Sequence, residues 1–151
     1  MGRVTTTVAI ALGANLGDRA AQLQFAVERL SVILGGVRVS AFIESEPVEV
    51  SEPQPPYLNG AIVGETSLSA RELLAALRAI EQQQGRVRLS HHAARTLDLD
   101  LILYGDAIIA EPDLHVPHPR FRDRAFVLAP LKEIAPELVD PVTGKTIGEL
   151  P

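Results

Sequence analysis

Two aspartates, Asp98 and Asp100, lie two residues apart in a stretch whose pattern is that of a β-strand. Leucines alternate with them from Leu97 to Leu103, and because strand side chains alternate between faces, we expect the leucines on one face and the aspartates on the other. Side chains two positions apart in a strand are about 6–7 Å apart, so both carboxylates can bind one hard divalent cation, or two cations that share a phosphate chain. A metal site and the solvated outer face of a half-buried strand are both compatible with this pattern.

Arginines gather around the same strand. Half of the arginines lie between Arg86 and Arg124, although the formal net charge of the chain is −5. A guanidinium group donates two parallel hydrogen bonds to phosphate and stays charged. The connection that contains Arg86, Arg88 and Arg95 can be a solvated loop, but cations for phosphate oxygens beside anions for a metal favour a metal–nucleotide site.

Three other residues have chemistry that suits a ligand. His118 stands between Pro117 and Pro119, whose rings restrain the backbone, which favours a phosphate ligand or an acid over a freely moving histidine. A capped structural histidine is the alternative. Tyr57 and Asn59 share one face of an expected strand, where an aromatic ring and an amide serve either ligand binding or cross-strand packing and turn capping.

Hydrophobic periodicity predicts the elements that position these residues. We expect strands at residues 4–12, 37–44, 57–65 and 95–103, short extended pieces at 107–110 and 114–116, and helices at 19–34, 69–84 and about 126–134. Asp18 is the expected N-cap of the first helix, and Ser69 with Glu72 forms a capping box for the second. Residues 45–56, rich in proline and glutamate, are expected to form a loop, and the stretch after residue 135 a surface tail.

The glycine-bearing turn at residues 13–18 permits two interpretations. A glycine-rich connection between a strand and a helix is typical of phosphate binding, but this one lacks the spacing and the Lys-Ser/Thr pair of a P-loop. The other interpretation is a connection that needs positive φ.

Length and composition limit the function classes. A chain of 151 residues predicts a single domain, 1–151. The absence of cysteine excludes disulfides and thiolate metal sites and fits a reducing compartment. Without a signal-like segment or an apolar run of about 18 residues we expect a cytoplasmic protein with no membrane partner, and the acidic balance disfavours nucleic acid.

The motifs, taken in order, closely resemble those of the 6-hydroxymethyl-7,8-dihydropterin pyrophosphokinase family over nearly the whole chain. The resemblance rests on residues 11–19, 45–48, 57–59, 80–81, 85–88, 95–100, 116–119 and 124–128. It implies a ferredoxin-like α+β fold, an antiparallel sheet with packed helices in α/β/α layers, which agrees with the expected order of strand, helix, strand, strand, helix, strand. It also implies an ATP- and Mg-dependent diphosphotransferase that moves the pyrophosphoryl group of ATP onto the pterin hydroxymethyl group in folate biosynthesis, releasing AMP.

The resemblance also implies roles for individual residues. Two Mg²⁺ ions would be held by Asp98 and Asp100 and would bridge the phosphates of ATP, with Arg86 and Arg95 as the catalytic arginines. The pterin-binding residues would be Ser45, Pro47, Val48, Tyr57, Asn59, Asp98 and Phe126. The ATP-binding residues would be Glu81, Arg86, Arg88, Arg95, Leu101, His118 and Arg124.

The chain departs from the family pattern at two places, and two other functions remain open. His92-Ala93-Ala94 stands where Trp-Gly-Pro is common in relatives, and Glu49 where glycine is common. One alternative is a catalytically silent nucleotide-binding module of ferredoxin-like fold. The other is a different Mg-dependent Asp-x-Asp transferase, which would leave Tyr57, Asn59 and Phe126 unexplained. The expected partners are ATP and the pterin alone, and a monomer is compatible with the sequence.

Overall fold

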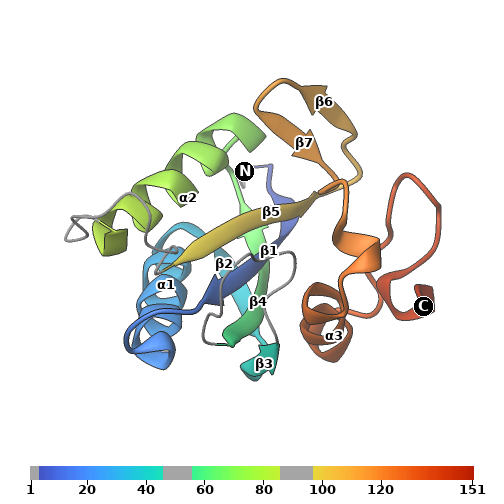
Figure 1. The fold of residues 1–151 in the computed structure, drawn as a ribbon. Helices are drawn as coiled ribbons and strands as arrows, with labels where there is room; N and C mark the ends of the chain where they lie inside the picture. Colours follow the sequence, from blue (N-terminus) through green and yellow to red (C-terminus); the bar gives the residue numbers. More distant parts are fainter. Residues whose placement is uncertain (1–3, 46–55, 86–96) are drawn as a thin grey trace.

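The computed structural model describes residues 4–45, 56–85 and 97–151 (Figure 1). The elements, in chain order, are β1 (Thr6–Ala14), α1 (Arg19–Ile33), β2 (Gly35–Val39), β3 (Ile43–Ser45), β4 (Tyr57–Thr66), α2 (Ala70–Gly85), β5 (Asp98–Tyr104), β6 (Ile109–Glu111), β7 (Leu114–Val116), the 3-10 helix η1 (Phe121–Asp123), α3 (Ala125–Ile134) and the 3-10 helix η2 (Ile147–Glu149).

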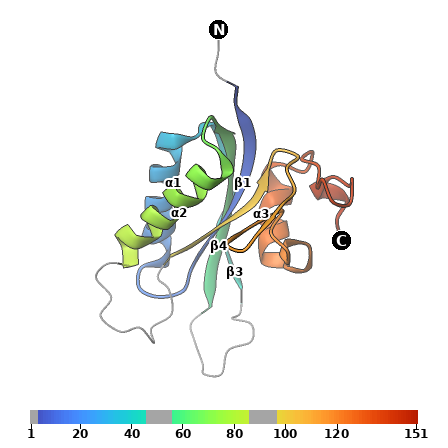
Figure 2. The same cartoon turned by 90° about the horizontal axis from the view of Figure 1, so that it is seen from above.

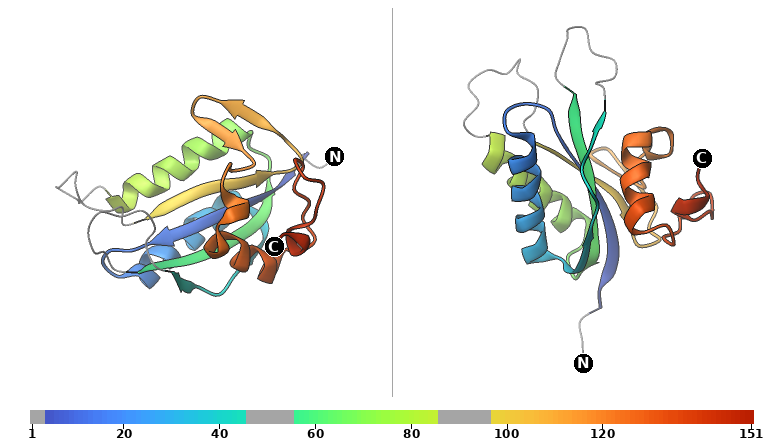
Figure 3. Two further views of the ribbon diagram at one scale, coloured as in Figure 1. Left: turned by 45° about the vertical axis from the view of Figure 1, so that its right-hand side comes forward. Right: turned by 90° about the horizontal axis from the view of Figure 1, so that it is seen from below.

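One antiparallel sheet carries the fold. Its strands run in the order β2-β4-β1-β5, with β3 also paired to β4, while β6 and β7 form a separate hairpin. Helices α1 and α2 lie on one side of the sheet and α3 lies on the other (Figures 2 and 3). The expected α+β fold with an antiparallel sheet between helical layers is confirmed.

The predicted helix starts are confirmed in atomic detail. The Asp18 carboxylate accepts the Ala21 N–H at 3.0 Å. Ser69 and Glu72 exchange two hydrogen bonds, each side chain accepting the other residue's backbone N–H. Gly17 has φ of 72°, which supports the interpretation of the preceding turn as a connection that needs positive φ.

The single strand expected at residues 37–44 is divided into β2 and β3, so this prediction was wrong. At the break, the buried Ser40 hydroxyl accepts the Ala61 N–H at 2.9 Å and donates to the Ala41 carbonyl at 2.8 Å. A side chain thus takes the place of a backbone ladder bond. The Phe42 ring then packs over Gly60, where a Cβ atom would lie only 2.8 Å from it.

Two hydrophobic clusters cover the two faces of the sheet. Val8, Ile10 and Leu12 pack with leucines of α1, α2 and β5 in the first cluster, and alanines of β1 and β4 pack with α3 in the second. The prediction that the β5 leucines share one face fails at Leu103, which joins the second cluster. The register of β5 against β1 shifts between Ala9 and Ile10, and such an irregularity turns the residues beyond it to the other face.

The stretch after residue 135 is not the expected surface tail. Asp140 is fully buried, and its carboxylate accepts two hydrogen bonds from Arg122, at 2.5 and 2.8 Å. Ile147 and Leu150 are buried against α3 in the second cluster. The apolar residues of this segment are widely spaced, and the partner of Asp140 is 18 residues away, so local periodicity does not reveal the packing.

In the described part of the chain, no helix has the length and apolar character needed to cross a membrane.

Candidate active site

Three residues lie side by side on the adjacent strands β4, β1 and β5, near one end of the sheet. Gly13 of β1 is paired with Asn59 of β4 on one side and with Asp98 of β5 on the other. Residues directly opposite each other in a sheet project their side chains to the same face. The amide of Asn59 and the carboxylate of Asp98 therefore lie on one face, separated by two strand spacings, about 10 Å.

The two aspartates project away from the helix-covered core formed by α1 and α2. Leu97, Leu99 and Leu101 belong to that core, whereas Asp98 and Asp100 are half-buried on the face that α3 covers. The predicted alternation is confirmed over these residues. The side chain of Leu101 lies in the core, so any contact of this residue with ATP would use its main chain.

Burial and mutual repulsion define the electrostatics of the pair. Desolvation, followed by the charge of Asp98, raises the pKa of Asp100 from 3.8 to about 6. The positive charges of Arg78 and Arg124 oppose this shift, and Glu81 adds to it. Two carboxylates that resist joint ionisation form a site that favours a cation.

An ion pair on α2 holds the backbone of Leu99, the residue between the two aspartates. Glu81 accepts the Leu99 N–H at 2.7 Å, and Arg78 donates to the Leu99 carbonyl at 3.1 Å. Glu81 and Arg78 also bond each other at 2.8 Å. Both polar groups of an edge-strand residue are thereby fixed, which orients the neighbouring carboxylates. Glu81 was predicted to bind ATP, a role that remains a prediction, while the part of Arg78 was missed although it stands three residues before Glu81.

His118, Arg124 and Phe126 come to the same face from the segment before α3 and from its first turn. The backbone N–H of His118 donates to the Ile102 carbonyl of β5 at 3.1 Å. Arg124 lies 5.7 Å from the Phe126 ring centroid, and Phe126 packs against the second cluster. Arg124 influences the pKa of both Asp100 and His118, which places the three groups within electrostatic range of one another.

His118 is held as a neutral donor. Burial, together with the charge of Arg124, lowers its pKa, while Asp98 opposes the shift. Its Nδ1 accepts the Arg120 N–H at 3.2 Å. A neutral imidazole that accepts at Nδ1 carries its proton on Nε2, so His118 presents an N–H donor.

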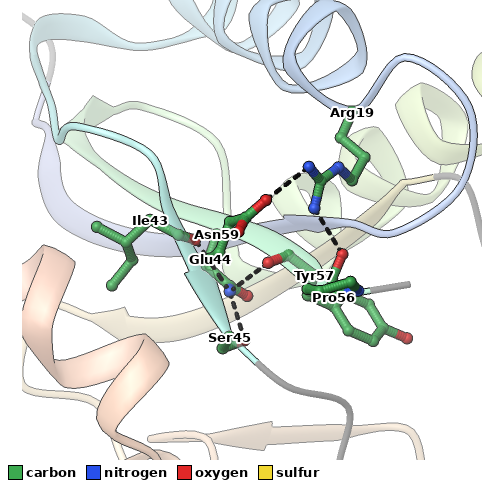
Figure 4. Close-up of polar contacts among 7 residues, drawn as sticks. All are labelled: Arg19, Ile43, Glu44, Ser45, Pro56, Tyr57 and Asn59. Atoms are coloured by element: carbon green, nitrogen blue, oxygen red, sulfur yellow. Dashed lines mark hydrogen bonds and ion pairs between the residues drawn. The ribbon is translucent and has the colours of Figure 1, made fainter. Parts of the chain in front are cut away.

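Asn59 is oriented by hydrogen bonds around its amide nitrogen (Figure 4). Its Nδ2 donates to the Ser45 hydroxyl at 2.7 Å and to the Ile43 carbonyl at 3.3 Å. A carbonyl only accepts, so the NH₂ group must face it. The Asn59 Oδ1 is then turned toward Gly13, where a Cβ atom would lie 3.6 Å from it.

Arg19, the first residue of α1, connects that helix to the two strands that carry Ser45 and Asn59. Its guanidinium bonds the Glu44 carboxylate of β3 and the carbonyl of Pro56, both at 2.7 Å (Figure 4). It therefore ties α1 to the strand that carries Ser45 and to the start of the strand that carries Asn59. No sequence signal identified this role, because the partners are 25 and 37 residues away.

Several predicted positions lie outside the described residues. They are Pro47, Val48, Glu49, Arg86, Arg88, His92-Ala93-Ala94 and Arg95. Of the predicted site residues that are described, Ser45, Tyr57, Asn59, Asp98, Asp100 and Phe126 lie on or beside one face, with His118 and Arg124 adjoining it.

The donor chemistry of the aspartate pair fits a magnesium ion that is shared with a phosphate ligand. Two carboxylates supply hard oxygen donors, as Mg²⁺ prefers. Within the described ranges, no group of three or more histidines, aspartates or glutamates could hold a metal ion. Phosphate oxygens and water would supply the remaining ligands, as is usual for magnesium bound with a nucleotide.

The raised pKa of Asp100 predicts a stability that depends on pH. Because the folded state holds this proton more tightly than the unfolded chain, stability falls as the pH rises from about 4 to about 6 and stays lower above that. We expect Asp100→Asn, in a chelator-containing buffer, to be more stable than the parent at pH 7.5 by about 1–3 kcal/mol. The gain should disappear near pH 4, as followed by urea unfolding. Asp106→Asn, at an exposed turn after β5, is the matched control, and a gain of equal size at both pH values would contradict the assignment.

Comparison with known proteins places these features in a family. A family model described as 7,8-dihydro-6-hydroxymethylpterin-pyrophosphokinase matches residues 9–136. The chain is 46% identical to the Synechocystis sp. protein named 2-amino-4-hydroxy-6-hydroxymethyldihydropteridine pyrophosphokinase, covering 93% of this chain and 72% of that one. It is 44% identical to the Haemophilus influenzae protein of the same name, covering 95% of this chain and 90% of the relative.

Solved structures show the same fold. The crystal structure of wild-type Plasmodium falciparum HPPK-DHPS superposes with a TM-score of 0.78 over 99% of this chain, at 14% sequence identity. The chain spans 44% of that longer protein. At this level of identity the likeness concerns the fold alone.

Proposed function

The chain belongs to the 7,8-dihydro-6-hydroxymethylpterin-pyrophosphokinase family, and we propose that the face carrying Asn59 and Asp98 is where it performs the family's reaction. The enzyme transfers the pyrophosphoryl group of ATP to the hydroxymethyl group of 6-hydroxymethyl-7,8-dihydropterin in folate synthesis. The observation that supports this location is the shared row of the sheet, in which the oriented amide of Asn59 and the carboxylate of Asp98 face the same side with one strand between them, and Asp100 lies in the next row.

The pterin half of the site would lie over β4. Asn59 Oδ1, turned toward Gly13 by the hydrogen bonds at Nδ2, would accept from the N–H donors on the edge of the pterin ring. Tyr57 and Phe126 would contact the two flat faces of the ring, an arrangement that suits a planar heterocycle. Ser45, with Pro47 and Val48, would contribute around its rim.

The ATP half would lie over β5. Asp98 and Asp100 would hold two Mg²⁺ ions, which polarise the phosphates and offset their charge when bound. Arg124 and the Nε2–H of His118 would donate to phosphate oxygens. The arginines at 86, 88 and 95 would supply further donors, with Arg86 and Arg95 offsetting the charge that develops on the transferred group.

The reaction requires mainly alignment. The pterin hydroxyl loses its proton to water as its oxygen bonds to the β-phosphorus, the bond from that phosphorus to the bridging α-phosphate oxygen breaks, and AMP leaves with that oxygen. Positioning and charge stabilisation are the principal contributions in phosphoryl transfer. The Glu81–Arg78 pair contributes to positioning by fixing the peptide between Asp98 and Asp100.

The remaining expectations accompany this proposal. We propose that residues 1–151 act as a single pyrophosphokinase domain, as a monomer in the cytoplasm, with neither nucleic acid nor membrane as a partner.

Measurement of AMP release tests the proposed function. We expect AMP from ATP and Mg²⁺ only when 6-hydroxymethyl-7,8-dihydropterin is present, in a one-to-one ratio with the pyrophosphorylated pterin, because the hydroxyl is the acceptor. Omission of the pterin and chelation of the metal are the controls. ATP binding without AMP release would instead support the silent nucleotide-binding module. Release of a nucleoside diphosphate from a nucleotide sugar, without pterin-dependent AMP, would support a different Asp-x-Asp transferase.

A further inference from the structure

Gly13 occupies the middle of the row that joins the two halves of the site. It is paired with Asn59 on β4 and with Asp98 on β5. A ligand that touches both of these side chains must therefore pass directly over Gly13. Nothing described so far assigns this glycine a role.

The fold itself does not require glycine at position 13. A Cβ atom there would lie 3.6 Å from Asn59 Oδ1 and 3.7 Å from the Tyr57 ring, both ordinary van der Waals distances, and the backbone φ is outside the left-handed region. Gly60 and Gly105 differ: a Cβ atom at Gly60 would lie 2.8 Å from Phe42, and Gly105 has φ of 54°. Since glycine inside a strand is less stable than alanine, its presence at position 13 calls for another reason.

We propose that Gly13 is a specificity-determining residue, whose missing side chain leaves room for the edge of the pterin ring between Asn59 and Asp98. This inference rests on the proposed function. An added methyl group would touch Asn59 Oδ1, the acceptor for the ring edge, and the ring of Tyr57, which packs against the pterin. The methyl group would occupy the space that the edge of the bicyclic ring needs. The next row on this face, Ala61–Ala11–Asp100, lies closer to the middle of the sheet and also has only small side chains at its first two positions.

Substitution by alanine should separate binding from folding. We expect Gly13→Ala to raise KM for 6-hydroxymethyl-7,8-dihydropterin by at least about tenfold, because overpacking a close contact is strongly unfavourable. KM for ATP should change by less than about twofold. The unfolding temperature should stay the same or rise by about 1–4 °C, because alanine restricts the unfolded chain and fits the strand. The larger Gly13→Val should bind no detectable pterin by calorimetry while still unfolding cooperatively.

Gly35→Ala is the matched control. Gly35 begins β2 in an extended conformation, and a Cβ atom there would meet nothing within 4 Å. We expect this variant to show a similar change in unfolding temperature and an unchanged KM for the pterin. The opposite signs of the two effects at position 13, weaker pterin binding with equal or higher stability, distinguish a role in the ligand site from a structural one.

Two results would overturn the inference while leaving the proposed function intact. One is an active Gly13→Ala enzyme whose KM for the pterin matches that of the parent. The other is a loss of stability with parallel losses for ATP and pterin, which would mean that glycine is needed by the fold. Failure of the proposed function would be visible earlier, in the parent enzyme, as an absence of pterin-dependent AMP.

Discussion

The Asp98→Ala variant should lose about a thousandfold or more in turnover and unfold at a temperature no lower than that of the parent, because the charge that repels Asp100 is removed. Its carboxylate is half-buried on the site face, whereas its neighbours Leu97 and Leu99 fill the core, so the substitution leaves core packing unchanged. The proposed ions would lose one of two protein carboxylates. Electrostatic stabilisation of that kind contributes several kcal/mol, and each 1.36 kcal/mol is a factor of ten in rate. AMP release at saturating substrates and calorimetric unfolding measure the two quantities.

Two further variants make this result specific. Asp98→Asn keeps the shape of the side chain and removes its charge, so it should lose nearly as much activity as the alanine variant. Asp106→Ala removes an exposed carboxylate just beyond β5 and should keep full turnover. A folded Asp98→Ala enzyme with more than a tenth of the parent's turnover would exclude a role for Asp98 as a metal ligand.

Of the variants proposed for this protein, Asp140→Ala should show the largest decrease in the free energy of unfolding, about 2–4 kcal/mol. The carboxylate is fully buried and accepts hydrogen bonds from Arg122, from the Thr143 hydroxyl at 2.8 Å and from the Val142 N–H at 3.0 Å. Removal of one partner of a buried ion pair leaves the other without compensation, which is far more costly than losing an exposed pair. Urea unfolding at pH 7 measures the change.

The pH dependence of Asp140 provides a second measurement. The hydrogen bonds from Arg122, aided by those from Thr143 and Val142, lower its pKa to about 2, against a usual value of 3.8. A depressed pKa means that the pair stabilises the fold above about pH 4 and that this contribution is lost as the pH falls toward 2. The difference in stability between Asp140→Ala and the parent should therefore shrink over that range.

Glu137→Ala is the matched control for this pair. Glu137 is in the same segment and also pairs with an arginine, Arg38, at 2.9 Å, but both side chains are about half exposed. We expect a loss below about 1 kcal/mol. Equal losses in the two variants would mean that burial of Asp140 is not what makes its ion pair important.

Local patterns were sufficient for much of the fold and for the chemistry of the site. The alternation around Asp98 and Asp100, the N-cap at Asp18 and the capping box at Ser69 depend on residues within a few positions of one another. Such interactions are encoded in short windows of sequence, so strands, helix starts and the paired carboxylates were predictable. The ordered motifs also led to the family, which the comparisons confirm.

Contacts between distant residues were decided by the tertiary structure. The division of the expected strand at Ser40 depends on Ala61, and the reversal of Leu103 depends on an irregular register with β1. The burial of Asp140 depends on Arg122, in η1. In each case the partner is too far along the chain for hydrophobic periodicity to indicate it.

The same distinction applies to the site. By itself the sequence determined which residues have the chemistry for a cation, phosphates and a flat heterocycle, because residue type and strand alternation are local properties. Only the antiparallel register of three strands brought Asn59, Gly13 and Asp98 into one row. That register results from long-range pairing and core packing across the whole domain, so the importance of the glycine between the two functional side chains emerges only from the folded structure.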